Sequence, residues 1–163
     1  MHFATFHDLE DQSVFITGGG SGIGADLTRG FLSQGAKVTF IQRSYPEKIL
    51  AECEGKYKHD LSFIQCDVTK TKELKKALQA TENKQGPVSI LVNNAANDTR
   101  HTLGEFTSEQ WDDAMNVNLK PHFFAAQEVV EGMKKNGGGS IINFSSISYM
   151  MGNEGYPAYA TAK

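Results

Sequence analysis

A glycine-rich turn between a predicted strand and a predicted helix constrains the fold of this chain more than any other feature. Residues 14–17 (Val-Phe-Ile-Thr) favour a strand, and residues 18–24 contain five glycines. Apolar side chains then recur at helical spacing, at Ile23, Leu27 and Phe31. The N–H groups at a helix start attract an anion, and glycine lets a phosphate approach the backbone closely. The turn therefore predicts a nucleotide-phosphate site, although a glycine-rich surface turn would share this composition.

The spacing of the glycines narrows the kind of nucleotide. A P-loop places a lysine directly after its last glycine, because that lysine reaches the terminal phosphates. Gly19 and Gly24 have the P-loop spacing, but Ala25 stands where the lysine is needed. The strict dinucleotide pattern Gly-x-Gly-x-x-Gly is not matched either, since residues 17–24 read Thr-Gly-x-x-x-Gly-x-Gly. We therefore expect no P-loop site for ATP or GTP.

The composition predicts a single globular domain over residues 1–163, with 39% hydrophobic residues and a net charge of -3. That charge leaves no basic field for nucleic acid. No apolar run reaches membrane-spanning length, and residues 1–8 lack the pattern of a secretory signal. Cys53 and Cys66 form no ligand cluster, so we expect no metal site and a reducing, cytoplasmic location.

Apolar strand patterns alternate with helical patterns along the chain. Strands are predicted at residues 14–17, 37–42, 61–66, 88–93 and 140–145. Helices are predicted from Ile23, from Pro46 as first helical residue to about Cys53, after a Thr69 cap, and over 108–135 with an interruption near Asn118 and Pro121. This alternation predicts an α/β fold with a doubly wound parallel sheet covered by helices on both faces.

Residues that follow the strands deserve the closest reading, because ligands of such sheets bind at the carboxyl ends of the strands. Arg43 and Ser44 follow Gln42, and no acid stands there to bind the ribose 2′-hydroxyl of NAD. Arg43 could bind the 2′-phosphate of NADP, with hydrogen bonds from Gln42 and Ser44. We therefore expect NADP. NAD stays open, since a neutral Gln42 also serves NAD and Arg43 could be a solvated loop residue.

Two residues at the end of the chain have the spacing of a catalytic pair. Tyr159 and Lys163 are four residues apart, so they share a face if the segment is helical. The alternative is a tyrosine that packs its ring beside a lysine that points to water. Ser146 at the end of a predicted strand and Asn118 at the helix interruption are polar residues in places that also favour function.

The turn at 17–24, the Asn-Asn-Ala-Ala segment at 93–96 and the Tyr159/Lys163 pair resemble the short-chain dehydrogenase/reductase family, over essentially the whole chain. Ala96 stands where the family has glycine. The resemblance implies a Rossmann fold that binds NAD or NADP, with Asp67 at the adenine; Asp67 could equally be a helix-initiating acid. The cofactor-binding residues that it implies are Thr17, Gly18, Ser21, Gly22, Ile23, Gly24, Gln42, Arg43, Ser44, Asp67, Val68, Asn94, Ala95, Ala96, Tyr159 and Lys163.

The resemblance also assigns four catalytic roles. Tyr159 is the base that takes the proton of a carbinol, and Ser146, thirteen positions upstream, holds the substrate oxygen. Lys163 binds the nicotinamide ribose, and Asn118 anchors a water that links the lysine to solvent. Such a base needs its pKa of about 10 lowered by roughly 2–3 units. A positive charge about 4 Å from the phenolate stabilises it by about 4 kcal/mol at an effective dielectric constant of about 20. A lysine ammonium near Tyr159 could therefore lower its pKa by the amount that the base needs.

The substrate is predicted from the polar segment 97–101 (Asn-Asp-Thr-Arg-His) and from residues 137–144. Both resemble the branch of the family that contains aldose 1-dehydrogenases. We therefore expect an NAD(P)-dependent oxidoreductase acting on an alcohol or carbonyl, with an aldose as the preferred substrate. The segment 97–101 could instead cap a helix or meet another subunit. The alternatives are a 3-oxoacyl-thioester reductase and, outside the enzymes, a dinucleotide-binding or redox-sensing module.

The end of the chain at Lys163 carries a further expectation. Members of the family continue through more of the helix, two more strands and a loop over the substrate. We therefore expect a domain that is incomplete at its C-terminus and, as an isolated polypeptide, weakly stable with little or no activity. The resemblance implies a dimer or tetramer for the full-length protein, and neither nucleic acid nor membrane as a partner.

Overall fold

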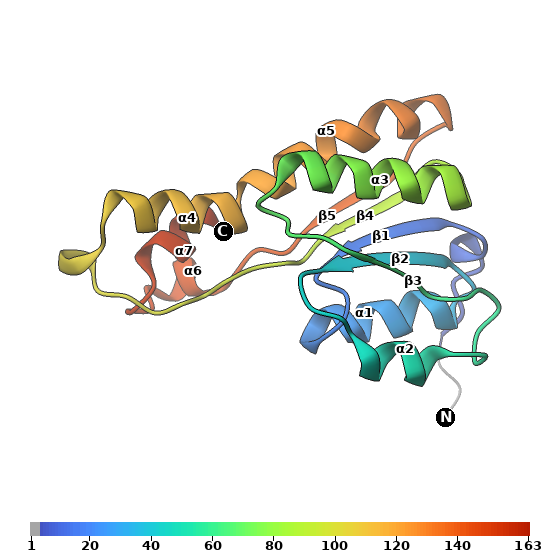
Figure 1. Cartoon of the computed structure of the whole chain (residues 1–163), viewed down its shortest axis with the longest axis horizontal. Coiled ribbons are helices and arrows are strands. Elements are labelled where there is room, and N and C mark those ends of the chain that lie inside the picture. Colours follow the sequence, from blue (N-terminus) through green and yellow to red (C-terminus); the bar gives the residue numbers. More distant parts are fainter. Residues whose placement is uncertain (1–3) are drawn as a thin grey trace.

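The computed structural model describes residues 4–163 and forms one parallel sheet with helices on both faces (Figure 1). The strands lie in the order β3-β2-β1-β4-β5, and every neighbouring pair is parallel. Their bounds are β1 Ser13–Thr17, β2 Lys37–Gln42, β3 Ser62–Gln65, β4 Ile90–Asn93 and β5 Ser140–Asn143. The doubly wound parallel α/β fold predicted from the sequence is confirmed.

The helices fall into three groups. Helices α1 and α2 cover one face of the sheet, α3 and α5 cover the other, and α4, α6 and α7 gather beyond the carboxyl ends of the strands (Figure 1). Their bounds are α1 Gly22–Ser33, α2 Glu47–Cys53, α3 Thr71–Gln85, α4 Ser108–Asn118, α5 Lys120–Lys135, α6 Ser148–Met151 and α7 Pro157–Ala162, with short 3-10 turns η1 His7–Leu9 and η2 Leu103–Glu105. Across residues 4–163, none of these helices is both long and apolar enough to cross a membrane.

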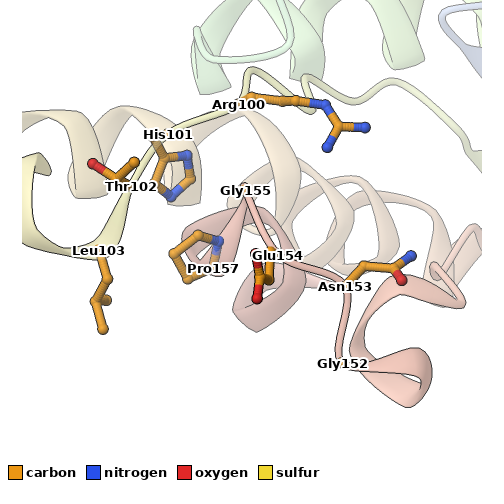
Figure 2. Close-up of a pocket in the computed structure, with 9 residues that line it drawn as sticks. All are labelled: Arg100, His101, Thr102, Leu103, Gly152, Asn153, Glu154, Gly155 and Pro157. Carbon is orange, nitrogen blue, oxygen red and sulfur yellow. The ribbon is translucent and has the colours of Figure 1, made fainter.

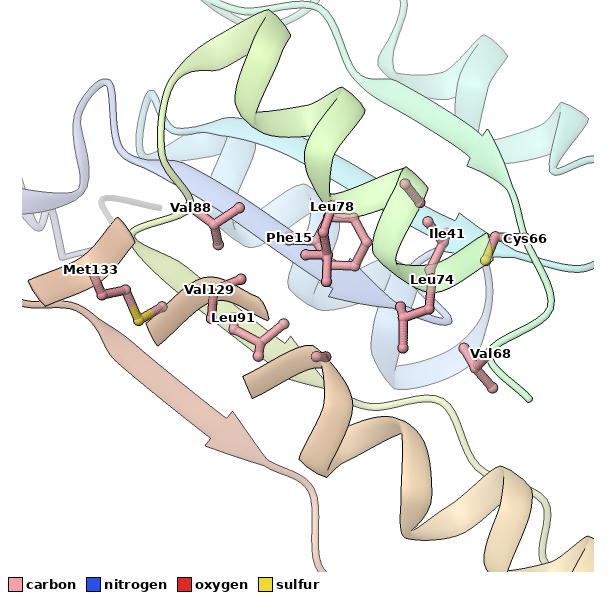
Figure 3. Packing of buried hydrophobic residues seen from close by; sticks show 12 residues of the cluster. Phe15, Ile41, Cys66, Val68, Leu74, Leu78, Val88, Leu91, Val129 and Met133 are labelled. Atoms are coloured by element: carbon pink, nitrogen blue, oxygen red, sulfur yellow. The ribbon is translucent and has the colours of Figure 1, made fainter. Parts of the chain in front are cut away.

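The sheet separates two apolar cores. Phe15 of β1 packs with Leu78 and Val129 on the side of α3 and α5 (Figure 3). Its neighbours Val14 and Ile16 point the other way, into the core beneath α1 and α2. All five residues of β1 are buried. A strand covered on both faces must be apolar along its whole length, which is why the sequence here shows a continuous apolar run rather than an alternation.

The apolar face predicted for the first helix is wrong at its first position. Ile23 is 63% exposed, whereas Leu32 is buried against the sheet. Small residues occupy the buried positions of the first turn, Gly24 and Ala25. A Cβ on Gly24 would overlap the carbonyl oxygen of Gly18. The start of α1 therefore lies too close to the end of β1 for a large side chain, and Ile23 turns outward.

Two predicted helix starts are displaced. Pro46 is the N-cap of α2 instead of its first helical residue. Lys70, rather than Thr69, is the N-cap of α3. The backbone N–H of Thr69 donates to Oδ1 of Asp67 at 2.9 Å, so Thr69 belongs to a turn that precedes the helix.

The segment predicted as one interrupted helix over 108–135 is two helices. They divide at Leu119, whose backbone is not helical, with φ of -124° and ψ of -54°. Pro121 is the second residue of α5, where its missing N–H breaks no hydrogen bond. The proline therefore starts a helix instead of kinking one.

The last strand of the sheet differs from the others in burial. All four residues of β5 are exposed, and Ile141 and Ile142 are 38% and 42% exposed. The predicted strand at 140–145 is also longer than β5 itself, because residues 144 and 145 lie beyond the end of the strand and have no regular secondary structure. The edge formed by β5 thus leaves a large part of its two isoleucine side chains exposed.

The order of the strands places the site. The chain builds outward from β1 to β3 on one side of the sheet and then returns to place β4 on the other side of β1. Ligands of such sheets bind where the order reverses, at the carboxyl ends. Thr17 at the end of β1 lies opposite Asn93 at the end of β4. The glycine turn and the segment 93–96 therefore meet at this point.

Candidate functional site

The glycine turn adopts a conformation that few other residues could reach. Gly18 and Gly22 have φ of +70° and +50°, in the left-handed region that favours glycine. A Cβ added to Gly19 would strike the side chains of Phe40 and Thr28. The hydroxyl of Thr28 also donates to the carbonyl oxygen of Gly19 at 2.9 Å. The turn is thus held in shape by contacts that leave no room for side chains.

The start of α1 holds no group that would compete with an anion. Ser21 is the N-cap, its side chain makes no capping hydrogen bond, and the first turn contains no acidic residue. Ser21, Gly22 and Ile23 are exposed. The backbone N–H groups of a first turn lack partners within the helix and lie at the positive end of its dipole. The residues present therefore fit the pyrophosphate of a dinucleotide.

The ends of β1 and β4 are joined through side chains. The hydroxyl of Thr17 accepts hydrogen bonds from the backbone N–H groups of Asn94 and Ala95, at 2.9 and 3.0 Å. The Asn94 amide donates to the carbonyl oxygens of Thr17 and Gly18, at 3.0 and 3.1 Å. The structure thus brings together four predicted cofactor-binding residues. The polar groups of Thr17 and Asn94 are therefore used in hydrogen bonds within the protein.

The end of β2 carries the residues that were predicted to choose the cofactor. The Gln42 amide donates to the carbonyl oxygen of Ser44 at 2.8 Å, and a Cβ on Gly20 would strike it. Gln42 therefore braces the glycine turn. The side chains of Arg43 and Ser44 are exposed beside it. Of these three residues, Arg43 and Ser44 face solvent and Gln42 faces the protein.

The end of β3 supports the helix-initiating interpretation of Asp67. Its Oδ1 accepts from the Thr69 N–H, and Val68 is buried in the core beneath α3. Burial also raises the pKa of the Cys66 thiol to about 11, so this cysteine is not a nucleophile at neutral pH. A role for Asp67 and Val68 at the adenine stays a prediction, as does the close approach of Ala96, which is exposed.

Asn118 is fully buried and ties α4 to the loop that follows β4. Its Oδ1 accepts from the Asn97 N–H at 2.8 Å, and its Nδ2 donates to the carbonyl oxygens of Asn97 and Ala114, at 2.9 and 3.0 Å. The helix ends immediately afterwards. The interruption seen in the sequence is therefore the place where the Asn118 side chain is fixed. Its predicted link to a water stays a prediction.

Tyr159 and Lys163 lie one turn apart, since the Lys163 N–H donates to the carbonyl oxygen of Tyr159 at 3.1 Å. Nζ of Lys163 is 5.8 Å from the centroid of the Tyr159 ring and donates to the carbonyl oxygen of Phe144 at 2.8 Å. Burial lowers the pKa of Lys163. Within residues 4–163 the Tyr159 hydroxyl makes no hydrogen bond, so the protein leaves it open to a ligand.

Ser146 follows β5 but is not joined to this pair. Its Oγ lies 2.8 Å from Oγ of Ser148 and accepts from the Ser148 N–H at 3.2 Å. Among the described residues, no hydrogen bond connects Ser146 with Tyr159. Tyr156 instead meets the Tyr159 ring edge-on, with ring centroids 5.8 Å apart. The structure thus brings Tyr159 and Lys163 together, and holds Ser146 through a second serine that sequence reasoning did not identify.

His122 is a further residue that sequence reasoning missed. Its Nε2 is buried and has no hydrogen-bond partner among the residues that the structure describes. Burial, with the charge of Lys163 as a second cause, lowers the pKa of His122 to about 4. Both residues line a cavity of about 400 Å³ together with Phe144. The His122 imidazole, which is neutral at physiological pH, thus faces Lys163. The sequence feature that could have identified His122 is its position four residues after Asn118.

The polar loop 97–101 makes most of its bonds within the protein. Oδ1 of Asn97 accepts from both the N–H and the hydroxyl of Thr99. The Arg100 guanidinium lies over the Tyr156 ring, 4.9 Å from its centroid. Residues 100–103 and 152–157 face each other across a cavity of about 610 Å³ (Figure 2). The loop therefore mainly holds neighbouring segments of the protein in place, and the cavity lies between the loop and the segment that precedes α7.

The comparison with protein families accounts for this arrangement of parts. The family model described as short chain dehydrogenase matches residues 12–163. The chain belongs to this family. The short-chain dehydrogenase motifs predicted from the sequence, the glycine turn above all, therefore lie on the fold that they implied.

Three relatives show which members of the short-chain dehydrogenase family the chain is similar to. A probable galactose dehydrogenase from Rhizobium meliloti is 44% identical over 97% of this chain and 62% of its own length. A D-xylose 1-dehydrogenase from Caulobacter vibrioides is 43% identical over 100% and 64%. A 3-oxoacyl-[acyl-carrier-protein] reductase from Thermotoga maritima is 35% identical over 95% and 63%. The chain thus spans somewhat less than two thirds of the length of these relatives.

Proposed function

We propose that this chain forms the dinucleotide-binding and proton-transferring part of an NAD(P)-dependent oxidoreductase that oxidises an aldose at C1. The observation that carries the proposal is the placement of Tyr159 and Lys163. They lie one turn apart, Tyr159 on α7 and Lys163 directly after it, with the lysine amine bound to the Phe144 carbonyl oxygen and, within residues 4–163, no hydrogen bond to the tyrosine hydroxyl. The uncapped start of α1 supplies the matching anion site at the same end of the sheet.

The chain's own groups account for the proton. Oxidation of a carbinol removes a hydride and a proton, and a bound nicotinamide supplies the hydride acceptor. Tyr159 takes the proton as phenolate. The Lys163 ammonium, whose nitrogen lies 5.8 Å from the centroid of the Tyr159 ring, attracts the negative charge of the phenolate oxygen. Burial lowers the pKa of Lys163, so its charge acts in a site where water screens it weakly.

The substrate class is supported by the relatives. Those at 43–44% identity are a galactose dehydrogenase and a xylose 1-dehydrogenase, whereas the acyl-carrier-protein reductase is at 35%. Sugars present a row of hydroxyl groups, and the cavity between residues 100–103 and 152–157 has polar residues on both sides, including Arg100, Asn153 and Glu154 (Figure 2). We infer that these residues face the sugar hydroxyls remote from C1.

The preferred cofactor is NADP. Arg43 is exposed at the end of β2, beside the glycine turn, where it has space to meet a 2′-phosphate. No acidic residue stands at positions 42–44 to repel that phosphate or to select NAD. We further infer a cytoplasmic homo-oligomer for the full-length protein. The support for the oligomer is a group of exposed apolar side chains on α4, on α5 and at the residue between them, namely Trp111, Phe123 and Leu119.

One assay separates the candidate functions. The full-length protein is offered a panel of aldoses with NADP and with NAD, and in parallel 3-oxoacyl thioesters with NADPH and NADH. The proposal expects aldose oxidation, faster with NADP. Turnover of the thioesters alone would establish the reductase. Tight dinucleotide binding without any turnover would support a non-catalytic module.

The matched variant is Tyr159→Phe, which removes one oxygen atom. We expect turnover to fall by about 10³-fold while the dissociation constant of the cofactor stays within about twofold, because only proton transfer is lost. Tyr156→Phe is the control, since Tyr156 neighbours Tyr159 but has alanine four residues on. Full activity of the Tyr159 variant would disprove the assignment.

A further inference from the structure

The loop that follows β4 is hydrogen-bonded through His101 to the segment that leads into α7. Its backbone N–H donates to the carbonyl oxygen of Gly155 at 2.7 Å. Figure 2 shows the His101 side chain projecting from the loop on the side of Gly155 and Pro157. Two segments that are far apart in the sequence, 97–101 and 152–158, are thus joined at the start of α7, which carries Tyr159 and ends directly before Lys163.

Both ring nitrogens of His101 are engaged. Nε2 lies 3.1 Å from the backbone N of Ala158, and Nδ1 lies 3.1 Å from the carbonyl oxygen of Thr99. A backbone N–H can only donate and a carbonyl can only accept. The network therefore requires the neutral tautomer with the hydrogen on Nδ1 and the lone pair on Nε2. The ring is also stacked on Phe106, with centroids 3.8 Å apart.

The hydrogen bond from Ala158 satisfies a group that α7 itself leaves without a partner. The helix has six residues, and its N-cap Tyr156 contributes no side-chain cap. Pro157 has no N–H, so Ala158 carries the first free donor of the helix. A single short helix is marginal by itself, because the cost of its first turn is repaid only by further turns or by packing. His101 supplies from outside the cap that the local sequence lacks.

We propose that His101 is a positioning residue that fixes α7, and with it Tyr159 and Lys163, through the Ala158 N–H. The inference rests on the proposed function for its effect on catalysis. Ala158 is 1% exposed and directly precedes Tyr159, so movement at Ala158 displaces the tyrosine. The other end of the same loop is bound to Asn118 through Asn97. One loop therefore sets the spacing between Asn118 and the Tyr159/Lys163 pair.

In this positioning role, His101 does not bind the sugar directly. Its two nitrogens are already paired within the protein, and neither is left for a hydroxyl of the substrate. Arg100, by contrast, places its guanidinium over Tyr156 on the rim of the cavity. Loss of His101 should therefore change the rate of the reaction more than the affinity for the sugar.

The test compares His101→Phe with His101→Gln in the full-length protein. Phenylalanine keeps the stacked ring but removes the acceptor, whereas the glutamine amide oxygen can reach the Ala158 N–H. We expect kcat to fall about 10- to 100-fold in H101F, with KM for the aldose and the cofactor within about threefold. H101Q should restore kcat to within about threefold of the wild type. Equal kcat in H101F and the wild type, or a failure of H101Q to restore it, would overturn the inference.

Two measurements remain informative without activity. Amide hydrogen exchange across residues 156–163 should quicken about tenfold in H101F and return to the wild-type rate in H101Q. The nitrogen NMR signals of wild-type His101 should show a protonated Nδ1 and an unprotonated Nε2, even if H101F fails to fold. A wild type with no turnover but with these two results would refute the proposed function and leave the positioning role in place. The opposite tautomer, or unchanged exchange in a folded H101F, would refute the positioning role.

Discussion

The two halves of the site are built by different means. The glycine turn and the ends of β1 and β4 are held by backbone conformation and by the absence of side chains: Gly18 has a φ of +70°, and Gly24 has no room for a Cβ. The half that holds the proposed catalytic residues gathers Asn118, Tyr159 and Lys163 from separate segments, and hydrogen bonds to the side chains of Asn118 and His101 hold these segments together.

This difference determines what each half tolerates. A turn that depends on missing atoms fails when an atom is added, because backbone cannot move aside cheaply. A region that depends on side-chain hydrogen bonds fails when a group is removed, and it recovers when a similar group is put back. Substitutions of the first kind should therefore cost more stability than those of the second kind.

The largest effect is expected from Gly24→Ala. The new Cβ would overlap the Gly18 carbonyl oxygen and would also press on the Asn94 amide. We expect the free energy of unfolding to fall by about 3 kcal/mol, and dinucleotide binding to be lost with the shape of the turn. Chemical denaturation followed by circular dichroism, with cofactor titration of the folded fraction, measures both.

Gly30→Ala is the control within the same helix. A Cβ at Gly30 meets no atom within 4 Å, and the residue is exposed in the interior of α1. Alanine should therefore stabilise the protein by about 0.5–1 kcal/mol, because it loses less conformational entropy on folding. If both variants lose similar stability, the close approach of Gly24 to Gly18 is not what shapes the turn.

The same contrast explains what the sequence could predict. Glycine spacing and apolar runs report local requirements, so the turn at Thr17 and Gly18, all five strands and their alternation with helices could be predicted from the sequence. The proposed catalytic residues were predicted from resemblance, which indicated Tyr159 and Lys163 but not the residues that hold them in place. The pairing of Ala158 with His101 spans 57 positions, and no local pattern indicates it.

Errors in the prediction have a similar origin. Ile23 fits a helical apolar face, and only the tight contact between α1 and β1 turns it outward. The burial of His122 depends on the later segment that brings Lys163 beside it. Side-chain surroundings of this kind arise from tertiary packing, and propensity or periodicity carries no information about them.

The second prediction tests the junction of β1 with β4 through Thr17→Val. Valine has nearly the same shape but cannot accept the hydrogen bonds from the Asn94 and Ala95 N–H groups. We expect the free energy of unfolding to fall by about 2 kcal/mol, since two donors are left unpaired in a partly buried place. Thr17→Ser keeps the acceptor and should cost about 1 kcal/mol for the lost methyl. A valine variant as stable as the serine variant would show that these bonds contribute little.

The smallest effect concerns His122 and depends on pH. The pKa of His122 is lowered to about 4 in the folded state, whereas a histidine in the unfolded chain has a pKa of about 6.5. Between these two pH values the unfolded chain therefore binds a proton that the folded protein does not bind. Stability contributed by the neutral imidazole is therefore present above about pH 6.5 and is lost as the pH falls towards 4.

Two variants isolate this contribution, His122→Phe and His122→Gln, neither of which titrates. We expect the wild type to lose about 1–2 kcal/mol more unfolding free energy than either variant between pH 7.5 and pH 5, in urea titrations at both pH values. Using one apolar and one polar replacement separates titration from a change in packing, since only titration is common to both. If the wild type and both variants lose the same amount, the buried imidazole beside Lys163 takes up its proton without unfolding, and the part of the site around Lys163 is more open to water than the turn.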